Sequence, residues 1–456
     1  MSYRPITLRA IFILLGTGLI LRLLLAYVIL PGSGYLGDIG LYSKWALAIA
    51  SLGPSGFYAE THANYPPGYI YVLWLIGSIS HTVASVTGAN MQKICNSLIK
   101  LPPMLLDAGA GFLIYQITQL WSGQTDAAKN TALLAAASYI FNPVTLYDSA
   151  IWGQTDASGV FIMLLGIMAL SRWPPEVSAS IAVISALIKP QFGVILIPLI
   201  GIALLRRHLL ARTHSNDSSQ HPFWASHEGP VRIFTSVAVA TVVFYVLVIP
   251  FNMSLEGFIE HMTRTAQQYK FLSVNAFNPW ALVGSGNTLA LMQGGISVLS
   301  RDDIPLIGSL TGVMIGTAFL ISGFFLGVAR LLWRSDWLSI VLVGAYFCLC
   351  FFILPTRVHE RYLFPVFGFT ALLTGFDRKW LRTTLVLAIG SLMNFHAVLS
   401  KIGTPNVMDI PFGQFLRAPT GILISSLLQT AVLPFMAWHL CRTWPHTRYR
   451  GVVAVE

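Results

Sequence analysis

The sequence predicts an all-α polytopic membrane protein, and three observations favour this fold class. Apolar residues make up 55% of the 456 residues, charged residues make up 10%, and the mean hydropathy is +0.68. Apolar segments long enough to cross a bilayer recur from one end of the chain to the other. Most Lys and Arg residues lie in short segments between these stretches or near the termini, as expected for cytoplasmic loops. The net charge of +10 is therefore not a sign of nucleic-acid binding.

The first predicted element is an uncleaved membrane helix. Arg4 and Arg9 precede an apolar run that reaches Leu30. This run is too long for the core of a signal peptide and lacks a small-residue cleavage site. The same hydropathy pattern predicts twelve spans, at residues 8–30, 94–121, 129–147, 157–172, 178–188, 192–206, 233–251, 306–331, 337–354, 362–376, 381–399 and 421–440. A further apolar stretch at residues 67–85 is ambiguous and would make the count thirteen.

The basic segments indicate an orientation. With twelve spans both termini are cytoplasmic, and the basic segments at residues 206–232, 330–334, 377–382 and 442–450 all fall on that side, in agreement with the positive-inside rule. If residues 67–85 also spanned the membrane, every later loop would invert. We therefore expect residues 67–85 to form a juxtamembrane or re-entrant helix in the first outer loop. The prediction is a multi-pass protein of the plasma (inner) membrane.

The chain divides at its one strongly polar stretch, residues 211–229. We interpret residues 1–206 as an N-terminal module with a first outer loop at 31–93, and residues 207–230 as a cytoplasmic linker. Residues 231–456 form a C-terminal helical module with an outer loop at 252–305 and a polar loop at 355–361. The four cysteines lie in or beside predicted helices, which favours buried structural thiols over a disulfide or metal site. Asp107 lies within a span, and we expect it to pair with Lys100 or Lys93 or to line the site.

Asp38 begins the first outer loop, before an amphipathic stretch at residues 39–52. Tyr42 lies one helical turn further on the same side. A carboxylate at a helix start caps free N–H groups, and this interpretation and a catalytic role are compatible. Tyr65 precedes Pro66 and opens the next apolar stretch. Proline there is a helix-start signal, and Tyr65 is a candidate for the site.

Two further polar segments interrupt the apolar pattern. Gln154 and Asp156 lie in a short outer loop and suit hydrogen bonds to sugar hydroxyls, with helix capping by Asp156 as the alternative. Lys189, Pro190 and Gln191 break one long apolar run, and irregular backbone at membrane depth is tolerated inside protein or along a cavity. A lysine there needs an anion, so we favour a phosphate contact over snorkelling.

The densest group of charges follows the span at residues 337–354. Arg357, His359, Glu360 and Arg361 would be costly at a membrane surface unless they bind an anion, for which a phosphate is the obvious choice. The alternative is a structural ion pair of Glu360 with Arg361. In the outer loop at 252–305, Asn278 suits contact with a sugar or a lipid phosphate, or an interfacial anchor.

These segments resemble, in order and spacing, the GT-C superfamily of membrane glycosyltransferases. The chain looks most like the bacterial branch similar to the second GPI mannosyltransferase of eukaryotes. The resemblance covers nearly the whole chain and depends on Gly37-Asp38 with Tyr42 and Trp45, Tyr65 to Gly68, Lys100 to Pro103 with Asp107, Asn142-Pro143, Trp152 to Asp156, Lys189 to Gln191, Asn275 to Trp280, and His359 to Tyr362.

The resemblance implies an inverting transfer of a hexose, with mannose favoured, from a polyprenyl-phosphate sugar donor to an acceptor hydroxyl on the extracytoplasmic face. Asp38 would be the general base. Lys189, His359, Arg361 and Arg357 would bind the donor phosphate. The sugar or acceptor would meet Tyr42, Tyr65, Gln154, Asp156, Gln191 and Asn278. No Asp-x-Asp motif occurs at Asp38, so no cofactor or divalent metal is expected.

The expected partners are a polyprenyl-phosphate-linked sugar, a lipid or glycan acceptor and membrane lipids, with no nucleic acid. The alternative function is a transporter or flippase for an anionic or phosphorylated lipid, which would also explain a broken helix with a lysine. A transporter, however, should show paired broken helices in two repeated halves, and the sequence shows one clear break.

Overall fold

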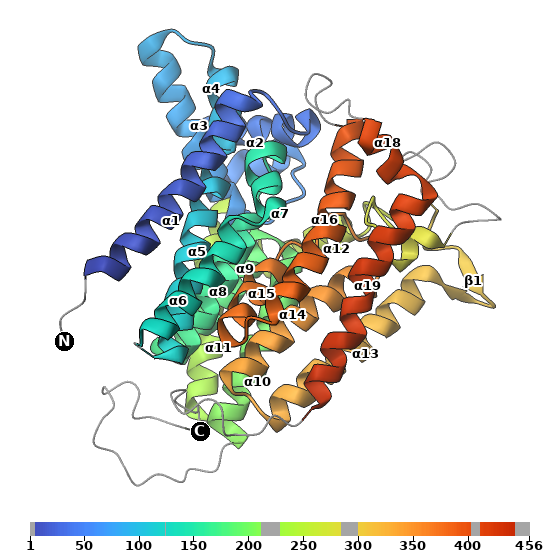
Figure 1. Cartoon of the computed structure of the whole chain (residues 1–456). Coiled ribbons are helices and arrows are strands. Elements are labelled where there is room, and N and C mark those ends of the chain that lie inside the picture. The colour runs from blue at the N-terminus through green and yellow to red at the C-terminus, as the bar shows by residue number, and fades with distance from the viewer. Residues whose placement is uncertain (1–4, 124, 211–228, 284–299, 403–410, 443–456) are drawn as a thin grey trace.

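The computed structural model describes residues 5–123, 125–210, 229–283, 300–402 and 411–442, and within them the chain is mostly helical (Figure 1). The first half holds α1 (Pro5–Leu24), η1 (Leu25–Ile29), α2 (Leu36–Thr61), α3 (Pro67–Thr87), α4 (Met91–Ile99), α5 (Leu101–Ser122), α6 (Asp126–Ile140), α7 (Pro143–Leu146), η2 (Tyr147–Trp152), α8 (Asp156–Arg172), α9 (Pro175–Ile188), α10 (Pro190–Leu205) and η3 (Arg206–Leu210).

The second half begins with α11 (Val231–Val248) and contains one two-stranded antiparallel sheet in its described part. Its elements are α11, η4 (Ile249–Phe251), α12 (Leu255–Ala266), η5 (Pro279–Leu282), β1 (Pro305–Ile307), β2 (Leu310–Thr311), α13 (Gly312–Trp333), α14 (Trp337–Ile353), α15 (Val366–Phe376), α16 (Trp380–Ile402), α18 (Pro411–Arg417) and α19 (Pro419–Cys441).

Eight helical stretches in the described residues are long and apolar enough to cross a membrane. They are Arg9–Ile29, Pro67–Thr87, Met91–Ser122, Pro190–Leu210, Val231–Phe251, Gly312–Trp333, Trp380–Ile402 and Pro419–Cys441. Three further apolar helices, α9, α14 and α15, are shorter, with 14, 17 and 11 residues. A bilayer needs about 20 helical residues, so several of the expected spans are shorter than a full crossing. The predicted class, an all-α polytopic membrane protein, is confirmed.

Helices α2, α3 and α4 gather at one end of the molecule, where α1 ends and α5 begins (Figure 1). We call this the α2 end. Helix α2 bends at Gly53, which has a φ of 70° and is followed by Pro54, so the expected helix at residues 39–52 forms the part before the bend. Helix α3 has 21 residues and is long enough to span, so its expected place outside the membrane stays a prediction.

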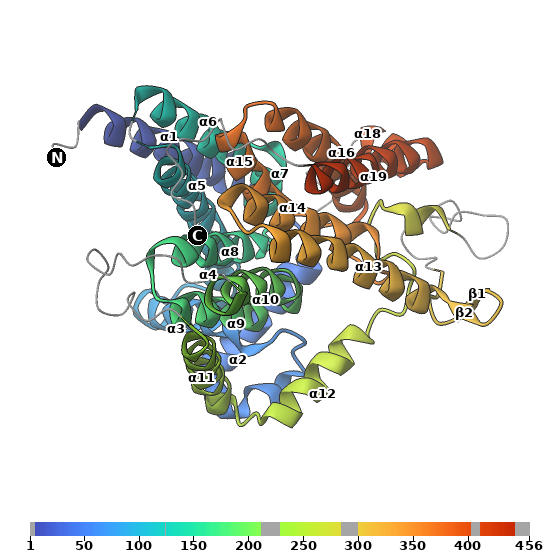
Figure 2. The same cartoon turned by 90° about the horizontal axis from the view of Figure 1, so that it is seen from below.

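The largest apolar core joins the two halves of the chain. It contains Leu164 and Phe347, which lie on opposite sides of the expected linker. Seen from below, α14 and α15 lie between α5 and α8 on one side and α16 and α19 on the other (Figure 2). The division at residues 207–230 stays a prediction, and most of that linker lies outside the described residues.

A buried ion pair joins α1 to α5. Arg22 Nε donates to Asp107 Oδ2 at 3.0 Å, and the exposed fractions of the two side chains are 1% and 0%. Tyr139 and Ser149 donate to the same carboxylate at 2.8 and 2.6 Å. The expectation that Asp107 pairs with Lys100 or Lys93 or lines the site is therefore wrong. Its partner Arg22 lies on α1, which hydropathy alone predicts only as an apolar span.

Lys100 has a different role. Its Nζ donates to the backbone carbonyls of Ser33, Ala150 and Ile151 at 2.6 to 3.1 Å. It therefore ties the residues after α1 to the end of η2, next to the polar loop that contains Gln154. Cys95, Cys348 and Cys350 are buried free thiols as expected, whereas Cys441 is exposed.

Candidate functional site

A cavity of 380 Å³ opens at the α2 end. This volume lies in the range of about 300–1,000 Å³ typical of small-molecule sites. Its walls come from α2, the start of α3, the junction of α9 and α10, the segment at residues 265–275, and the loop between α14 and α15. Seven residues predicted for the site line it: Asp38, Tyr42, Tyr65, Lys189, Gln191, His359 and Arg361.

The Asp38 carboxylate is held by Gln154. Asp38 lies in the first turn of α2 with 20% of its side chain exposed, and it accepts a hydrogen bond from the Gln154 side-chain amide. The N-cap of α2 is Tyr35, and no side chain caps this helix end, so capping does not explain Asp38. Gln154 itself is fully buried and fixes the carboxylate from behind the cavity wall.

The same amide connects two tyrosines to Asp38. The Tyr42 hydroxyl donates to Gln154 Oε1 at 3.1 Å, and the hydroxyls of Tyr42 and Tyr65 lie 2.8 Å apart. The result is a continuous chain of hydrogen bonds from Tyr65 to Asp38. Three sequence segments predicted for one site, around residues 38, 65 and 154, therefore meet through side-chain contacts.

Lys189 has its anion inside the protein. Its Nζ donates to Asp156 Oδ1 at 2.8 Å, and Gln191 Nε2 lies 3.3 Å from the same oxygen. Lys189 is extended, with φ −151° and ψ 134°, because α9 ends there and Pro190 begins α10. The predicted break is thus present. The lysine, however, meets a carboxylate of α8, so its predicted contact with a phosphate would have to compete with Asp156.

Arg361 lies among three carboxylates. Its Nη1 donates to Glu360 Oε1 at 2.6 Å and lies 3.9 Å from Asp38 Oδ2. Its Nε lies 3.6 Å from Asp156 Oδ2, too far for a hydrogen bond, and has no acceptor among the described residues. The side chain is 13% exposed. Glu360 is therefore the structural partner of Arg361, and Asp38 and Asp156 lie close enough to balance its charge as well.

Burial shifts the pKa values of the neighbouring His359 and Glu360 in opposite directions. Burial lowers the pKa of His359 well below 6.5, and the charges of Arg361 and Lys189 lower it further. Burial raises the pKa of Glu360, and Arg361 opposes this. His359 is therefore neutral at physiological pH. Its ring packs edge-on against Tyr269 at a centroid distance of 5.0 Å.

Four residues predicted for the site lie outside the cavity lining. Gln154 and Asp156 hold Asp38 and Lys189 from behind it, whereas Arg357 and Asn278 have partners elsewhere. The Arg357 guanidinium forms a fork with Asp302, with Nε–Oδ2 at 2.7 Å and Nη2–Oδ1 at 3.1 Å. Asn278 is fully buried and donates to the carbonyl of Phe352 at 2.8 Å. Both side chains join the loop at residues 252–305 to the α14 region. Their positions do not support the predicted contacts with phosphate and sugar.

Sequence reasoning missed several cavity residues, among them Asn64, Gln268 and Tyr269. None of these three stands in a motif. For Gln268 and Tyr269, the available signal was the segment with amide and aromatic side chains directly after the amphipathic stretch at residues 255–266. The described residues hold no group of three or more His, Cys, Asp or Glu side chains placed to bind a metal ion. The expectation that no metal is required stays a prediction.

Residues 47–280 match a family described as "PIG-U: GPI transamidase subunit PIG-U". This segment is more than half of the chain. The chain belongs to the PIG-U family. Within the matched segment lie Tyr65, Gln154, Asp156, Lys189 and Gln191, whereas Asp38 and Arg361 lie outside it. PIG-U is described as a subunit of a GPI transamidase, so the mannosyltransferase branch implied by the sequence resemblance is not what this match shows. No curated protein matches the chain.

The PIG-U family chain is also similar to solved structures of an oligosaccharyltransferase from Archaeoglobus fulgidus. The enzyme tethered to an acceptor peptide is 12% identical, with a TM-score of 0.43 over 97% of this chain and 60% of that one. The archaeal oligosaccharyltransferase AglB with an inhibitory peptide and a dolichol-phosphate is 12% identical, with a TM-score of 0.41 over 93% of this chain and 56% of that one. The apo form is 11% identical, with a TM-score of 0.44 over 97% of this chain and 61% of that one. The chain therefore spans about three fifths of the length of these structures, and at such identities the likeness says nothing of substrates.

Proposed function

We propose that this protein is an inverting glycosyltransferase that moves a hexose from a polyprenyl-phosphate sugar to a hydroxyl group of an acceptor. The observation that carries the proposal is the position of Asp38. Its carboxylate is partly exposed in an enclosed cavity, is held by Gln154, and lies 3.9 Å from the Arg361 guanidinium. A base beside a cation is what displacement of a phosphate by a hydroxyl group requires.

In this reaction Asp38 takes the proton of the acceptor hydroxyl. The acceptor oxygen forms a bond to the anomeric carbon while the bond from that carbon to the phosphate oxygen breaks. The phosphate monoester leaves with the electron pair, from the face opposite the attack, so the configuration inverts. General-base catalysis of this kind contributes about 10²–10⁴-fold to the rate.

The leaving phosphate would be bound by Arg361 and His359. Arg361 lines the cavity with 13% of its side chain exposed, and His359 is a neutral ring that can donate one hydrogen bond. Lys189 would lie behind the phosphate and contribute less, because Asp156 balances its charge. Tyr42, Tyr65 and Gln191 would hold the sugar. Mannose as the hexose depends on the sequence resemblance, as does the placement of the site on the extracytoplasmic face.

A second candidate function is favoured by the family match. As a transamidase subunit, the chain would use the same cavity to hold a lipid-linked glycan for a catalytic partner. The residues that line the cavity include no Ser or Cys, the two commonest nucleophiles of acyl transfer. Transport of an anionic lipid is less favoured, because Asp156 already neutralises the lysine at the helix break.

The test is a transfer assay with the purified full-length protein in nanodiscs. The donor is polyprenyl-phosphate-[¹⁴C]mannose, with polyprenyl-phosphate-[¹⁴C]glucose in parallel, and the acceptor is a total membrane-lipid extract from the host. We expect labelled product from the wild type and a loss of about 10²–10⁴-fold in the transfer rate of Asp38→Asn, which keeps the shape and removes the base.

Asp126→Asn, at an exposed carboxylate on α6, is the matched control, and its transfer rate should be unaffected. Equal transfer by Asp38→Asn and wild type would overturn the proposal. No transfer with either donor, together with retained donor binding, would favour the subunit.

A further inference from the structure

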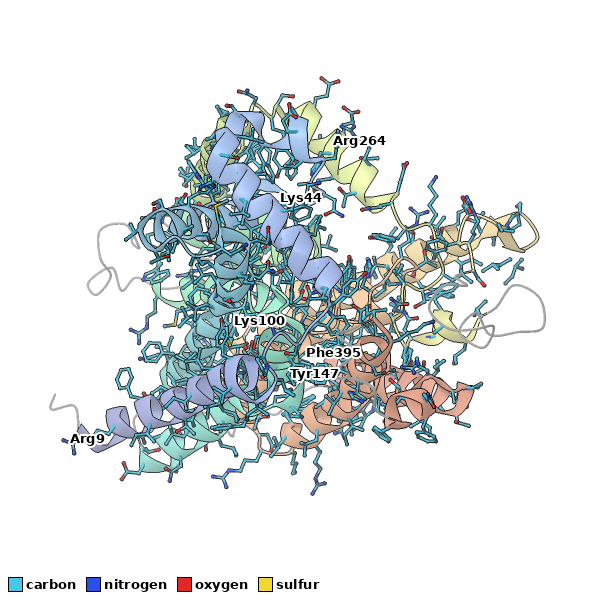
Figure 3. The ribbon with its side chains drawn as sticks, turned by 90° about the horizontal axis from the view of Figure 1, so that it is seen from above. Arg9, Lys44, Lys100, Tyr147, Arg264 and Phe395 are labelled. Carbon is cyan, nitrogen blue, oxygen red and sulfur yellow. The ribbon has the colours of Figure 1, made fainter. Side chains whose placement is uncertain are left out.

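A second cavity, of 710 Å³, adjoins the first at the α2 end. It lies between the part of α2 that follows the bend at Gly53 and helix α12. Figure 3 shows Arg264 on α12 beside this part of α2. Asn64, Thr265 and Gln268 line both cavities. The two spaces are therefore separated by a boundary only about one side chain thick.

Hydrogen bonds hold this boundary. Asn64 Nδ2 donates to Gln268 Oε1 at 2.8 Å, and the Thr265 hydroxyl donates to the Asn64 carbonyl at 3.2 Å. The Asn64–Gln268 bond is exposed, and an exposed hydrogen bond contributes little net stability. A ligand that supplies its own polar groups can replace this bond at small cost.

Two residues that line the second cavity each carry a buried polar atom without a hydrogen-bond partner among the described residues. The two atoms are Asn64 Oδ1 and His261 Nε2. Burial lowers the pKa of His261, which makes its ring neutral, and a hydrogen bond to the Tyr65 backbone acts in the opposite direction. A neutral ring that donates to that backbone keeps its other nitrogen as an acceptor. Both unpartnered atoms therefore accept hydrogen bonds, and buried acceptors normally have a donor.

Backbone strain also concentrates here. In the described residues, the four non-glycine residues with positive φ are His62, Asn252, Asn275 and Arg357. His62 and Asn252 line the second cavity, and Asn275 lines the first. Such conformations recur at binding sites and also at helix C-caps, which is where His62 and Asn252 lie.

The lining identifies the chemistry of a ligand. His62 and Arg264 are basic, and the residues that line the cavity include no Asp or Glu. Arg264 is 71% exposed and lies 3.6 Å from Glu260, so it stands at the solvent side. The rest of the polar lining is mostly uncharged hydroxyl and amide side chains, such as those of Tyr58, Asn64 and Thr265, which match hydroxyl groups rather than a phosphate.

We propose that the second cavity binds the hydroxyl-rich ring of the acceptor, a sugar or a cyclitol, and presents one of its hydroxyl groups to Asp38 across the boundary at Asn64 and Gln268. The presentation to Asp38 rests on the proposed glycosyl transfer. The binding itself does not.

Binding is measured by saturation-transfer NMR on the full-length protein in nanodiscs, with methyl α-mannoside, myo-inositol and inorganic phosphate as separate probes. The blocking variant is Gly257→Trp. Gly257 lines the second cavity, and a Cβ there meets Ser254 Oγ at 3.4 Å and Met253 Cγ at 3.8 Å, which are ordinary contacts. The matched control is Thr263→Trp, on an exposed position of α12 outside both cavities. His261→Phe, which keeps an aromatic ring and removes both ring nitrogens, is the second variant.

We expect methyl α-mannoside or myo-inositol to bind the wild type and Thr263→Trp equally. Binding should weaken by about tenfold or more in Gly257→Trp and His261→Phe, with unchanged thermal unfolding. Unchanged affinity in both variants would place the ring elsewhere and overturn the proposal. Binding of phosphate without binding of either ring compound would also overturn it. If the wild type binds a ring compound, and both variants bind it more weakly, but the wild type transfers no sugar, then the proposed function fails and this site stands.

Discussion

Lys189 and Asp156 form a buried ion pair, with Nζ 2.8 Å from Oδ1 and side-chain exposed fractions of 6% and 0%. The pair joins the break between α9 and α10 to the first turn of α8. It explains why a lysine is tolerated at a helix break among apolar residues. Arg361 lines the same cavity and is 13% exposed against 6% for Lys189, so it is the more accessible of the two cations.

Removal of one partner of this pair should destabilise the protein. Lys189→Ala leaves the Asp156 carboxylate buried without its lysine, which costs about 3–5 kcal/mol. Thermal unfolding in detergent measures the effect. The control is Lys129→Ala, whose partner Asp126 is 83% exposed, and such pairs contribute about 0–1 kcal/mol. Equal stability of the two variants would mean that Asp156 finds another donor.

The pair of Arg22 with Asp107 should prove equally structural. Asp107→Leu leaves the Arg22 guanidinium without its counterion, and we expect a loss of about 3–5 kcal/mol of stability. The double variant Arg22→Leu with Asp107→Leu should recover much of this loss, because no unpaired charge remains. Thermal unfolding of the single and double variants measures the difference. An additive loss would contradict the ion-pair explanation.

His359 predicts a dependence of stability on pH. Its pKa in the folded protein is well below the ordinary value of 6.5, so the unfolded state binds more protons as the pH falls below 6.5. The contribution of neutral His359 is therefore fully present above pH 6.5 and is lost as the pH falls toward the folded pKa. Between about pH 7.5 and about pH 5.5, the melting temperature should fall more in the wild type than in His359→Gln. Identical falls would show that His359 is not held neutral.

The expected orientation can be tested with single cysteines. Cys441 is exposed, so the background is Cys441→Ser. Glu256→Cys lies on an exposed position of α12, and Lys379→Cys on an exposed position between α15 and α16. In intact cells a membrane-impermeant maleimide should label Glu256→Cys, and it should reach Lys379→Cys only after permeabilisation. The reverse pattern would place the cavity on the cytoplasmic side.

The sequence by itself determined the class of the protein and the segments that form the site. Hydropathy is a local property, so the apolar helices, the break at Pro190 and the polar loops can be read along the chain. The same reasoning identified seven residues that line the cavity. Asp38, Tyr65 and Arg361 are examples, because a charged or polar group between apolar segments needs either a partner or a ligand.

Only the tertiary structure decided which partner each of these groups has. Asp156 pairs with Lys189, Asp302 with Arg357, and Asp107 with Arg22, over separations of 33, 55 and 85 residues. Such contacts depend on how helices pack against one another, and no local pattern encodes them. The second cavity was hidden from the sequence for the same reason, since its walls come from α2 and α12, which are ordinary amphipathic segments until they lie side by side.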